Sequence, residues 1–426
     1  MTILAAIPPF TVLQDTRTDL ISGWLILYQT NVNMLAGDDV LLGSGAELGV
    51  GVGGVLDTNQ GHDSIEGSGV NGIYASGTIL SGLGNDTLIG NGRSCGIWIN
   101  NGTLNCGAGN DSITGTVVMP ASATGLLIGV WNSNGTIDAG AGDDVLSGSS
   151  SRAGTGIYNG SFITSGQSGV IKMGAGIDII RGSGGIGVFS VGLIDTGDGG
   201  DQIIGDALGS GVGIYSEVAG SIVMGGGNDT LSGSGGGTGI RLNMSTLDTG
   251  IGNDVIVGVG SISGVEITTS TITGGLGADK LMGTGDSVGI YNNTGVIDMG
   301  AGNDLVLGSG VISGITNYGR ILGGLGADTV DVFNGGLAGN GIIDLGPDGD
   351  TFRGFGSGYV MGGTGLDKIV LPDGTYQISS SVGTILSRGI TMNVSGFERI
   401  GGATSGLFTF ASGTVTVVSG VASFAA

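Results

Sequence analysis

Three apolar positions recur along the chain at fixed distances from a repeated aspartate. An apolar residue stands two positions after each aspartate and an aliphatic residue seven positions before it. A glycine–aliphatic step, such as Gly72–Ile73 or Gly289–Ile290, lies between the two. The repeat recurs about every 25 residues, and its aspartates are Asp39, Asp63, Asp86, Asp111, Asp144, Asp178, Asp201, Asp229, Asp254, Asp279, Asp304, Asp328, Asp350 and Asp367.

This spacing predicts one coil of a three-sided solenoid, because each of three short strands would carry an inward apolar residue. Stacked about 4.8 Å apart, the coils would pair in parallel and bury continuous apolar ladders that no single coil could bury alone. We therefore predict an all-β, right-handed parallel β-helix, a three-sided β-solenoid, over residues 34–371. Residues 1–33 and 372–426 are predicted to be terminal caps. A sandwich or propeller would not explain three ladders in register with one turn motif.

Composition agrees with a turn-rich β protein. Glycine accounts for 98 of 426 residues, yet the apolar fraction is 39%, which is higher than in disordered glycine-rich chains. A net charge of −23 argues against nucleic acid and favours cations. No apolar run approaches the roughly 20 residues of a membrane span, and the N-terminus lacks the pattern of a cleavable signal.

The turn before the aspartate reads x-G-x-G-x-D in eleven of the fourteen copies. Glycine permits positive φ and lets carbonyl oxygens converge, while the aspartate adds a hard anionic oxygen. Calcium takes six to eight oxygens at about 2.3–2.6 Å, which two stacked turns would supply together. The alternative is that each aspartate only caps its own turn, as in an Asx turn.

Two segments match a known motif closely: "GGLGADKLMG" at 274–283 and "GGLGADTV" at 323–330. They resemble the repeats-in-toxin, or haemolysin-type, calcium-binding nonapeptide G-G-x-G-x-D-x-apolar-x, and looser forms cover residues 37–371. The resemblance implies type I secretion by an uncleaved C-terminal signal, folding in extracellular calcium, and aspartate side chains as ligands. The predicted ligands are Asp63, Asp86, Asp111, Asp144, Asp178, Asp201, Asp229, Asp254, Asp279, Asp304, Asp328, Asp350 and Asp367.

The chain departs from that family in its period. The family's β-roll has two nonapeptides per coil, whereas here one motif serves about 25 residues, so we predict a wider coil with a single column of Ca²⁺ ions between successive coils. Six further acids directly follow the inward aliphatic residue, and they add negative charge along the same edge: Asp57, Asp138, Asp195, Asp248, Asp298 and Asp344.

No catalytic grouping is visible in the sequence. His62 is the only histidine and lies in a turn, and the arginines and lysines are scattered about one per coil. Nothing forms a Ser-His-Asp or Cys-His set. We expect no enzymatic activity, although some parallel β-helices act on acidic polysaccharides, so a lyase, an epimerase or a polysaccharide-binding adhesin remains the alternative.

An aromatic row follows the middle aliphatic residue of several coils, and strand alternation would place it outside. Such a row would serve as a sugar platform or a lateral protein contact, or would only stack and stabilise the face. Its members are Tyr74, Trp98, Tyr158, Phe189, Tyr215 and Tyr291.

The two cysteines and the C-terminal tail leave alternatives open. Cys95 and Cys106 would form a disulfide or remain two small buried hydrophobic residues. The tail from Gly406 has no charged residue, so it is a candidate type I secretion signal, a cap or an assembly strand.

These features together predict a secreted, calcium-binding structural protein of a bacterial surface layer, filament or extracellular matrix. Its expected partners are calcium and further copies of itself, with cell-surface polysaccharide as a candidate third.

Overall fold

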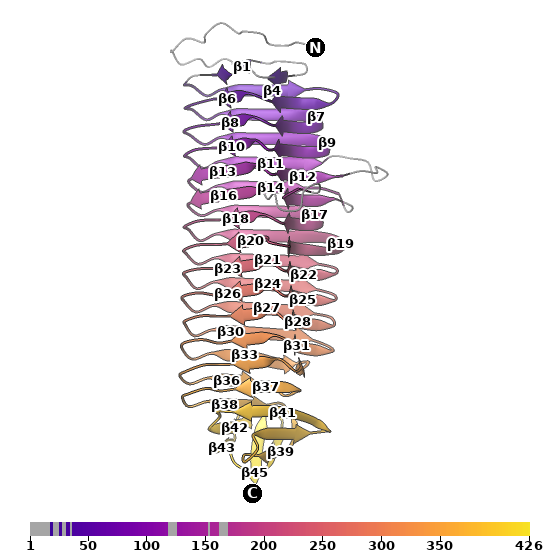
Figure 1. Ribbon diagram of the computed structural model, residues 1–426, viewed down its shortest axis with the longest axis vertical. Helices are drawn as coiled ribbons and strands as arrows, with labels where there is room; N and C mark the ends of the chain where they lie inside the picture. The colour runs from indigo at the N-terminus through magenta and orange to yellow at the C-terminus, as the bar shows by residue number, and fades with distance from the viewer. Residues whose placement is uncertain are drawn as a thin grey trace. The chain divides into compact units, whose positions relative to one another are not determined.

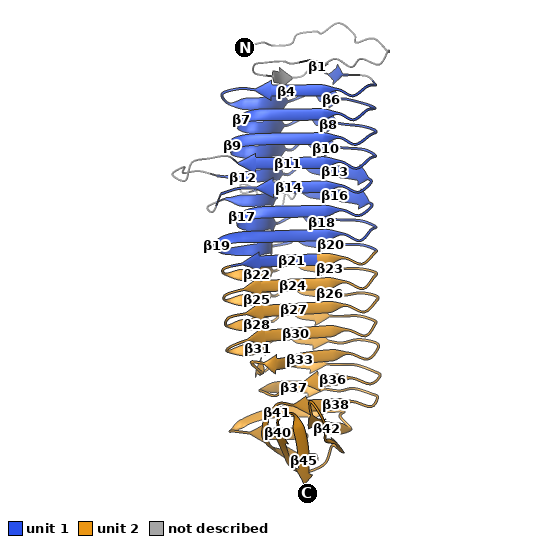
Figure 2. Ribbon diagram, turned by 180° about the vertical axis from the view of Figure 1, so that it is seen from behind, with its two compact units in different colours: residues 1–226, 231–235 blue, residues 227–230, 236–426 orange. Residues whose placement is uncertain are grey.

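The computed structural model describes residues 18–19, 25–27, 31–34, 36–117, 126–151, 154–161 and 169–426. These residues contain β-strands and no helix. They fall into two compact units, residues 1–226 with 231–235 and residues 227–230 with 236–426 (Figure 2). The predicted N-terminal cap, 1–33, lies mostly outside the described residues. Across the described part of the chain there is no helix with the length and apolarity that crossing a bilayer requires.

Unit 1 is a stack of coils in which each strand pairs in parallel with its equivalent in the next coil (Figure 1). The first strands of its coils are β1 (Thr18–Asp19), β4 (Val40–Ser44), β7 (Ser64–Ala75), β9 (Thr87–Asn100), β11 (Ser112–Val117), β14 (Val145–Ser149), β17 (Ile179–Ser190) and β19 (Gln202–Glu217). Of these, β7, β9, β17 and β19 continue without a break into the second strand of the same coil. The separate second strands are β2 (Leu25–Leu27), β5 (Leu48–Val52), β12 (Ile128–Ser133) and β15 (Thr155–Asn159). The third strands form a second sheet: β3 (Val32–Asn33), β6 (Val55–Asp57), β8 (Thr78–Leu80), β10 (Thr103–Asn105), β13 (Thr136–Ala141), β16 (Val170–Ala175), β18 (Leu193–Asp195) and β20 (Ser221–Val223).

Unit 2 repeats the same three-strand coil, while β21 (Thr230–Gly235) has residues in both units. Its first strands are β24 (Val255–Gly260), β27 (Lys280–Gly285), β30 (Leu305–Gly310), β33 (Thr329–Asn334), β36 (Thr351–Arg353) and β38 (Lys368–Leu371). The second strands are β22 (Thr238–Asn243), β25 (Ser263–Thr268), β28 (Val288–Asn293), β31 (Ser313–Asn317) and β34 (Leu337–Gly339). The third strands are β23 (Thr246–Asp248), β26 (Thr271–Thr273), β29 (Val296–Asp298), β32 (Arg320–Leu322), β35 (Ile342–Asp344) and β37 (Gly358–Met361).

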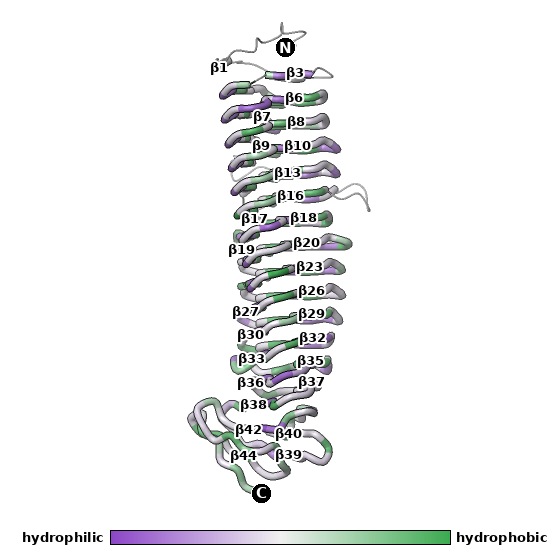
Figure 3. Tube along the Cα trace, turned by 90° about the vertical axis from the view of Figure 1, so that its left-hand side faces the viewer, coloured by the Kyte–Doolittle hydropathy of each residue, from purple (hydrophilic) through white to green (hydrophobic). Residues whose placement is uncertain are grey.

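The strand register confirms the predicted parallel β-solenoid of about 25 residues per coil. Within unit 2, the aliphatic residues two positions after successive aspartates are direct partners: Ile256 with Leu281, and Leu281 with Val306. The aliphatic residues that stand seven positions before successive aspartates are also direct partners, for example Ile272 and Ile297. Both sets are almost fully buried, and hydrophobic positions recur from coil to coil between more hydrophilic ones (Figure 3). The core is therefore a set of aliphatic ladders that each coil extends by one rung.

The C-terminal part of unit 2 changes from parallel to antiparallel pairing. Here β41 (Ile390–Ser395) and β42 (Arg399–Gly402) pair in parallel with β37 and β38, adding one more layer to the stack. Antiparallel partners then join them: β39 (Gly374–Ser379), β40 (Thr384–Ser387), β43 (Leu407–Thr409), β44 (Gly413–Val418) and β45 (Val421–Ala425). The predicted boundary between residues 371 and 372 stays a prediction, as does export through the tail.

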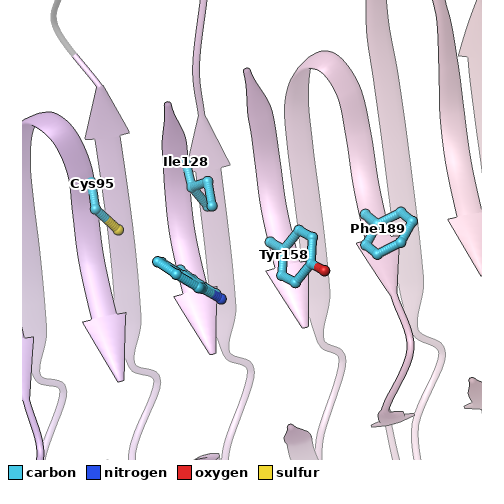
Figure 4. Close-up of a cluster of buried hydrophobic side chains, with 5 residues drawn as sticks. Cys95, Ile128, Tyr158 and Phe189 are labelled. Atoms are coloured by element: carbon cyan, nitrogen blue, oxygen red, sulfur yellow. The ribbon is translucent and has the colours of Figure 1, made fainter. Parts of the chain in front are cut away.

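The aromatic row of unit 1 is a stack of rings that cover one another. Trp131, which the sequence-based row omitted, stacks on Trp98 with ring centroids 4.6 Å apart. The row continues through Tyr158 and Phe189, whose centroids are 4.8 Å apart. Trp131, Tyr158 and Phe189 are 5–8% exposed and pack with Cys95 and Ile128 in one buried cluster (Figure 4). For Tyr158 and Phe189 the structure therefore agrees with the alternative that the row stacks and stabilises the face, because neighbouring coils bring the rings into contact.

Both cysteines are free and buried, which agrees with the alternative of two small hydrophobic residues. Burial also raises the pKa of each thiol well above its usual value.

Candidate metal-binding turns

The fourteen repeated aspartates, here called the ladder aspartates, point into the coil. Each stands immediately or closely before the first strand of its coil, and none is more than 6% exposed. The sequence led us to expect an edge of negative charge, but the structure places these carboxylates inside the turns. The six further acids, such as Asp248 and Asp298, lie at half-buried or exposed positions of the third strands.

The turn conformation explains the glycines that precede each aspartate. At Gly109 the φ angle is +145°, and a Cβ there would lie 1.8 Å from the carbonyl oxygen of Gly84 in the previous coil. Asn59 and Asp348 replace a glycine of the motif, yet both still adopt positive φ, with angles of 69° and 85°. The backbone of the turn therefore keeps a positive φ at these two positions even without glycine.

At twelve of the ladder aspartates, one carboxylate oxygen accepts a backbone N–H of the protein itself. The backbone N–H of one ladder aspartate donates to Oδ1 of the next at 2.7–2.9 Å, from Asp39 to Asp201 in unit 1. The same ladder runs from Asp229 to Asp367 in unit 2. One oxygen thus accepts a backbone N–H of a turn, but that turn belongs to the neighbouring coil and not, as in an Asx turn, to the aspartate's own.

Glu398 continues this ladder, and sequence analysis missed it. Its Oε2 accepts the N–H of Asp367 at 2.8 Å. The next residue, Arg399, stands opposite Lys368 in the parallel pairing of β42 with β38. The only signal was a buried aliphatic residue, Ile400, two positions after the acid. Because no glycine turn precedes Glu398, its sequence does not match the repeated motif.

The second oxygen, Oδ2, is buried and accepts no hydrogen bond at eleven of the ladder aspartates. These are Asp63, Asp86, Asp111, Asp144, Asp178, Asp254, Asp279, Asp304, Asp328, Asp350 and Asp367. A buried carboxylate oxygen without a hydrogen-bond partner is costly, so such a repeated arrangement fits a group that binds a cation or a proton.

Without a metal ion, burial shifts the titration of these carboxyls towards neutral pH. Burial, which penalises the charged form, raises the pKa of Asp86, Asp111, Asp144, Asp254, Asp304 and Asp350 to about 6. It raises the pKa of Asp178 and Asp328 to about 7, with neighbouring ladder carboxylates as a further cause. The hydrogen bond from the adjacent backbone N–H opposes these shifts.

Space for a cation is clearest where glycine stands five residues before the aspartate. A Cβ placed on Gly323 would lie 2.4 Å from the Leu345 carbonyl oxygen and 2.5 Å from Asp328 Oδ2. On Gly274 the corresponding distances, to Met299 O and Asp279 Oδ2, are 2.4 Å and 2.9 Å. Since calcium binds oxygens at about 2.3–2.6 Å, these glycines leave a space bounded by suitable ligands.

Gly362 stands at the same position before Asp367, where a Cβ would lie 3.0 Å from Asp367 Oδ2, whereas most other coils fill it with larger buried side chains. Cys106, Ala139, Met173, Met224, Met299 and Leu345 stand there and are at most 1% exposed. Thr58, Ser81, Thr196 and Thr249 instead place a hydroxyl there, and each donates to a backbone carbonyl of the next coil. The predicted column of equivalent ions is therefore better described as a series of unequal positions.

Side chains alone do not form a closed metal cluster. Among the described residues, no group of three or more His, Cys, Asp or Glu side chains is arranged to hold a metal ion. Any calcium bound here would need one carboxylate per coil together with backbone carbonyls, and the residues that fit this best are Asp279 and Asp328.

A second, outer set of hydrogen bonds forms where the residue just before a ladder aspartate is Asp, Asn or His. These side chains accept the N–H of the equivalent residue in the next coil, as Asn85 does from Asn110 and Asn253 from Ala278. His62 belongs to this set, because its Nδ1 accepts the N–H of Asn85 at 2.8 Å. The single histidine therefore has a structural contact.

Comparison with known proteins gives one similar structure. It is the X-ray crystal structure of a hyperactive, Ca²⁺-dependent, β-helical antifreeze protein from an Antarctic bacterium. The two share 18% sequence identity with a TM-score of 0.39, over 85% of this chain and 88% of that chain. No protein-family model matches the chain, and no curated protein matches it. The fold assignment rests on the strand pairings described above.

Proposed function

We propose that this chain is a secreted calcium-binding structural protein of repeats-in-toxin type, part of a bacterial surface layer, filament or extracellular matrix. The observation that carries the proposal is the column of buried Oδ2 atoms without hydrogen-bond partners. Bound calcium would supply positive charge to these oxygens. Ladder carboxylates and turn carbonyls would then be ligands instead of mutually repelling buried groups.

Extracellular location follows from the same chemistry. Extracellular calcium modules bind with dissociation constants of about 10⁻⁴–10⁻³ M, a range that suits partly filled ligand sets such as these. A net charge of −23 also keeps the calcium-free chain soluble and extended before it folds. Export through an uncleaved C-terminal signal belongs to this proposal.

Self-assembly is supported by an exposed apolar stripe on unit 2. Ile251, Leu276 and Leu325 are 56–62% exposed, and they stand in register three residues before their ladder aspartates. Ala301 completes the row. Apolar side chains aligned at the coil spacing favour contact with another copy, particularly once calcium lowers the net charge.

We expect thorough calcium removal at neutral pH to lower the melting temperature of the β-structure, and millimolar calcium to restore it. Folding and metal binding are coupled because the site exists only in the stacked coils. Far-UV circular dichroism during a calcium titration measures this, and light scattering of the same samples follows self-assembly. An unchanged spectrum and melting curve in excess chelator would contradict the proposal.

The alternative function is polysaccharide binding or modification. Assays of polyuronate depolymerisation and epimerisation separate an enzyme from a structural protein, and we expect no product in either assay. Appearance of a lyase or epimerase product would favour the alternative.

A further inference from the structure

A cavity of about 230 Å³ lies in unit 2, where the last coils meet the antiparallel C-terminal strands. Phe333 and Phe355 line it from the coils. Tyr376, Ser387 and Arg388 line it from β39, β40 and the turn that follows β40. The cavity is remote in sequence from the calcium turns of the earlier coils and uses none of the ladder aspartates.

The aromatic walls of the cavity are held in place. Phe355 and Tyr376 meet edge to face with centroids 5.1 Å apart, and the Tyr376 hydroxyl donates to the Pro372 carbonyl oxygen at 2.9 Å. The Arg353 guanidinium lies 4.9 Å from the Phe333 ring centroid and pairs with Asp331 at 2.8 Å. Fixed aromatic surfaces of this kind favour the apolar face of a small ring over a flexible chain.

Most polar groups around the cavity are already used by the protein. Both Asp373 carboxylate oxygens accept backbone N–H groups, from Ser419 and Gly420 at 2.9 Å and 2.8 Å. The Ser387 hydroxyl donates to the Thr375 carbonyl oxygen at 2.8 Å. These groups therefore shape the cavity and leave little capacity to bind a neutral polar ligand.

Arg388 is the exception. Its guanidinium makes no hydrogen bond or ion pair with any residue that the structure describes, and the side chain is exposed. It lies near enough to Tyr376 for its charge to act on the phenol. The backbone at Arg388 has φ +50°, and Gly389 follows with φ +79° in a two-residue hairpin between β40 and β41. Asn-Gly is the usual pair in such a turn, so an arginine there is a departure that local conformation does not favour.

We propose that this cavity binds a carboxylate carried on a small ring, with Arg388 pairing the carboxylate and the aromatic walls contacting the ring. Arginine matches a carboxylate with two parallel N–H donors. The volume falls below the roughly 300–1,000 Å³ of drug-sized sites, which suits a single ring. A hexuronate unit of an acidic polysaccharide and a free aromatic acid share this chemistry.

Binding is tested with the full chain in millimolar calcium, with isothermal titration calorimetry and saturation-transfer difference NMR as the measurements. The probes are galacturonate, benzoate and, as the neutral control, galactose. We expect one of the two acids to bind and galactose not to bind. Transfer to galacturonate protons identifies a sugar source, and transfer to benzoate protons identifies a free aromatic acid.

Two substitutions assign the contacts. Arg388→Gln should weaken acid binding about tenfold or more, because it removes a charge-assisted pair. Arg320→Gln, which changes an exposed arginine of the same unit, should leave binding unchanged. Failure of both acids to bind, or equal binding by Arg388→Gln and the unchanged chain, would overturn the proposal. The calcium proposal would be unaffected, because it rests on other residues.

Discussion

After calcium is removed, the protein is expected to melt at a lower temperature at about pH 7.5 than at about pH 5, by on the order of 10 °C. Unfolded aspartates titrate near 3.8, whereas burial raises the folded pKa of eight ladder aspartates to about 6 or 7. The folded state therefore binds more protons between these values. The stabilisation that these aspartates contribute is fully present below about pH 4, and it is lost as the pH rises through their folded pKa values of about 6 to 7.

Calcium should reverse this dependence. Protons compete with the ion for the same carboxylates, so the calcium-loaded protein should be more stable at about pH 7.5 than at about pH 5. Thermal melts monitored by circular dichroism, after treatment with a chelating resin and again with millimolar calcium, measure both trends. A metal-free melting temperature that rises with pH over this range would contradict the account of the ladder.

The matched control for this experiment is Asp304→Asn. Asparagine keeps an oxygen for the N–H of Asp279, which Asp304 Oδ1 accepts at 2.7 Å, but it cannot ionise. The substitution should raise the melting temperature of the metal-free protein at neutral pH and lower that of the calcium-loaded protein. A side chain that only caps the turn would change both in the same direction, so the opposite signs separate the two roles.

The second large effect is expected from Gly109→Ala. A Cβ at this residue would lie 1.8 Å from the Gly84 carbonyl oxygen, and φ is +145°. Relief requires the backbone of two coils to move apart, which breaks the ladder hydrogen bonds around Asp111. We expect a loss of about 2–4 kcal/mol in the free energy of unfolding.

Gly209→Ala is the control for backbone strain without crowding. Gly209 belongs to the same unit and has φ +70°, but a Cβ there would meet nothing within 4 Å. Its expected cost is about 1 kcal/mol or less, because only the conformational preference changes. Denaturant unfolding in calcium measures both variants, and equal losses would show that stacking of the turns does not limit this position.

The fold could be predicted from the sequence because every copy of the repeat places apolar residues at the same positions. Each aliphatic residue at the fixed positions, for example Leu281 or Ile297, has an equivalent one coil away, and only parallel stacking places all of them in contact. Single-copy features carry no such redundancy. Glu398 lacks the glycine turn, and its role follows only from the strand register that places Arg399 beside Lys368.

The site was predicted less completely than the fold. The sequence identified the ladder aspartates, but not that one carboxylate oxygen serves the neighbouring coil while the other has no partner. The direction of the aromatic side chains was inferred from alternation alone. Alternation left open whether the rings stack or form a platform, and only the contacts of Tyr158 and Phe189 with rings on adjacent coils decide for stacking.

The most direct test of the central claim is to count bound calcium by equilibrium dialysis and elemental analysis at millimolar free calcium. We predict more than one calcium ion per chain, and a smaller number when Asp279 and Asp328 are both replaced by alanine. Fewer than one calcium ion per chain at millimolar free calcium would contradict a calcium-binding solenoid.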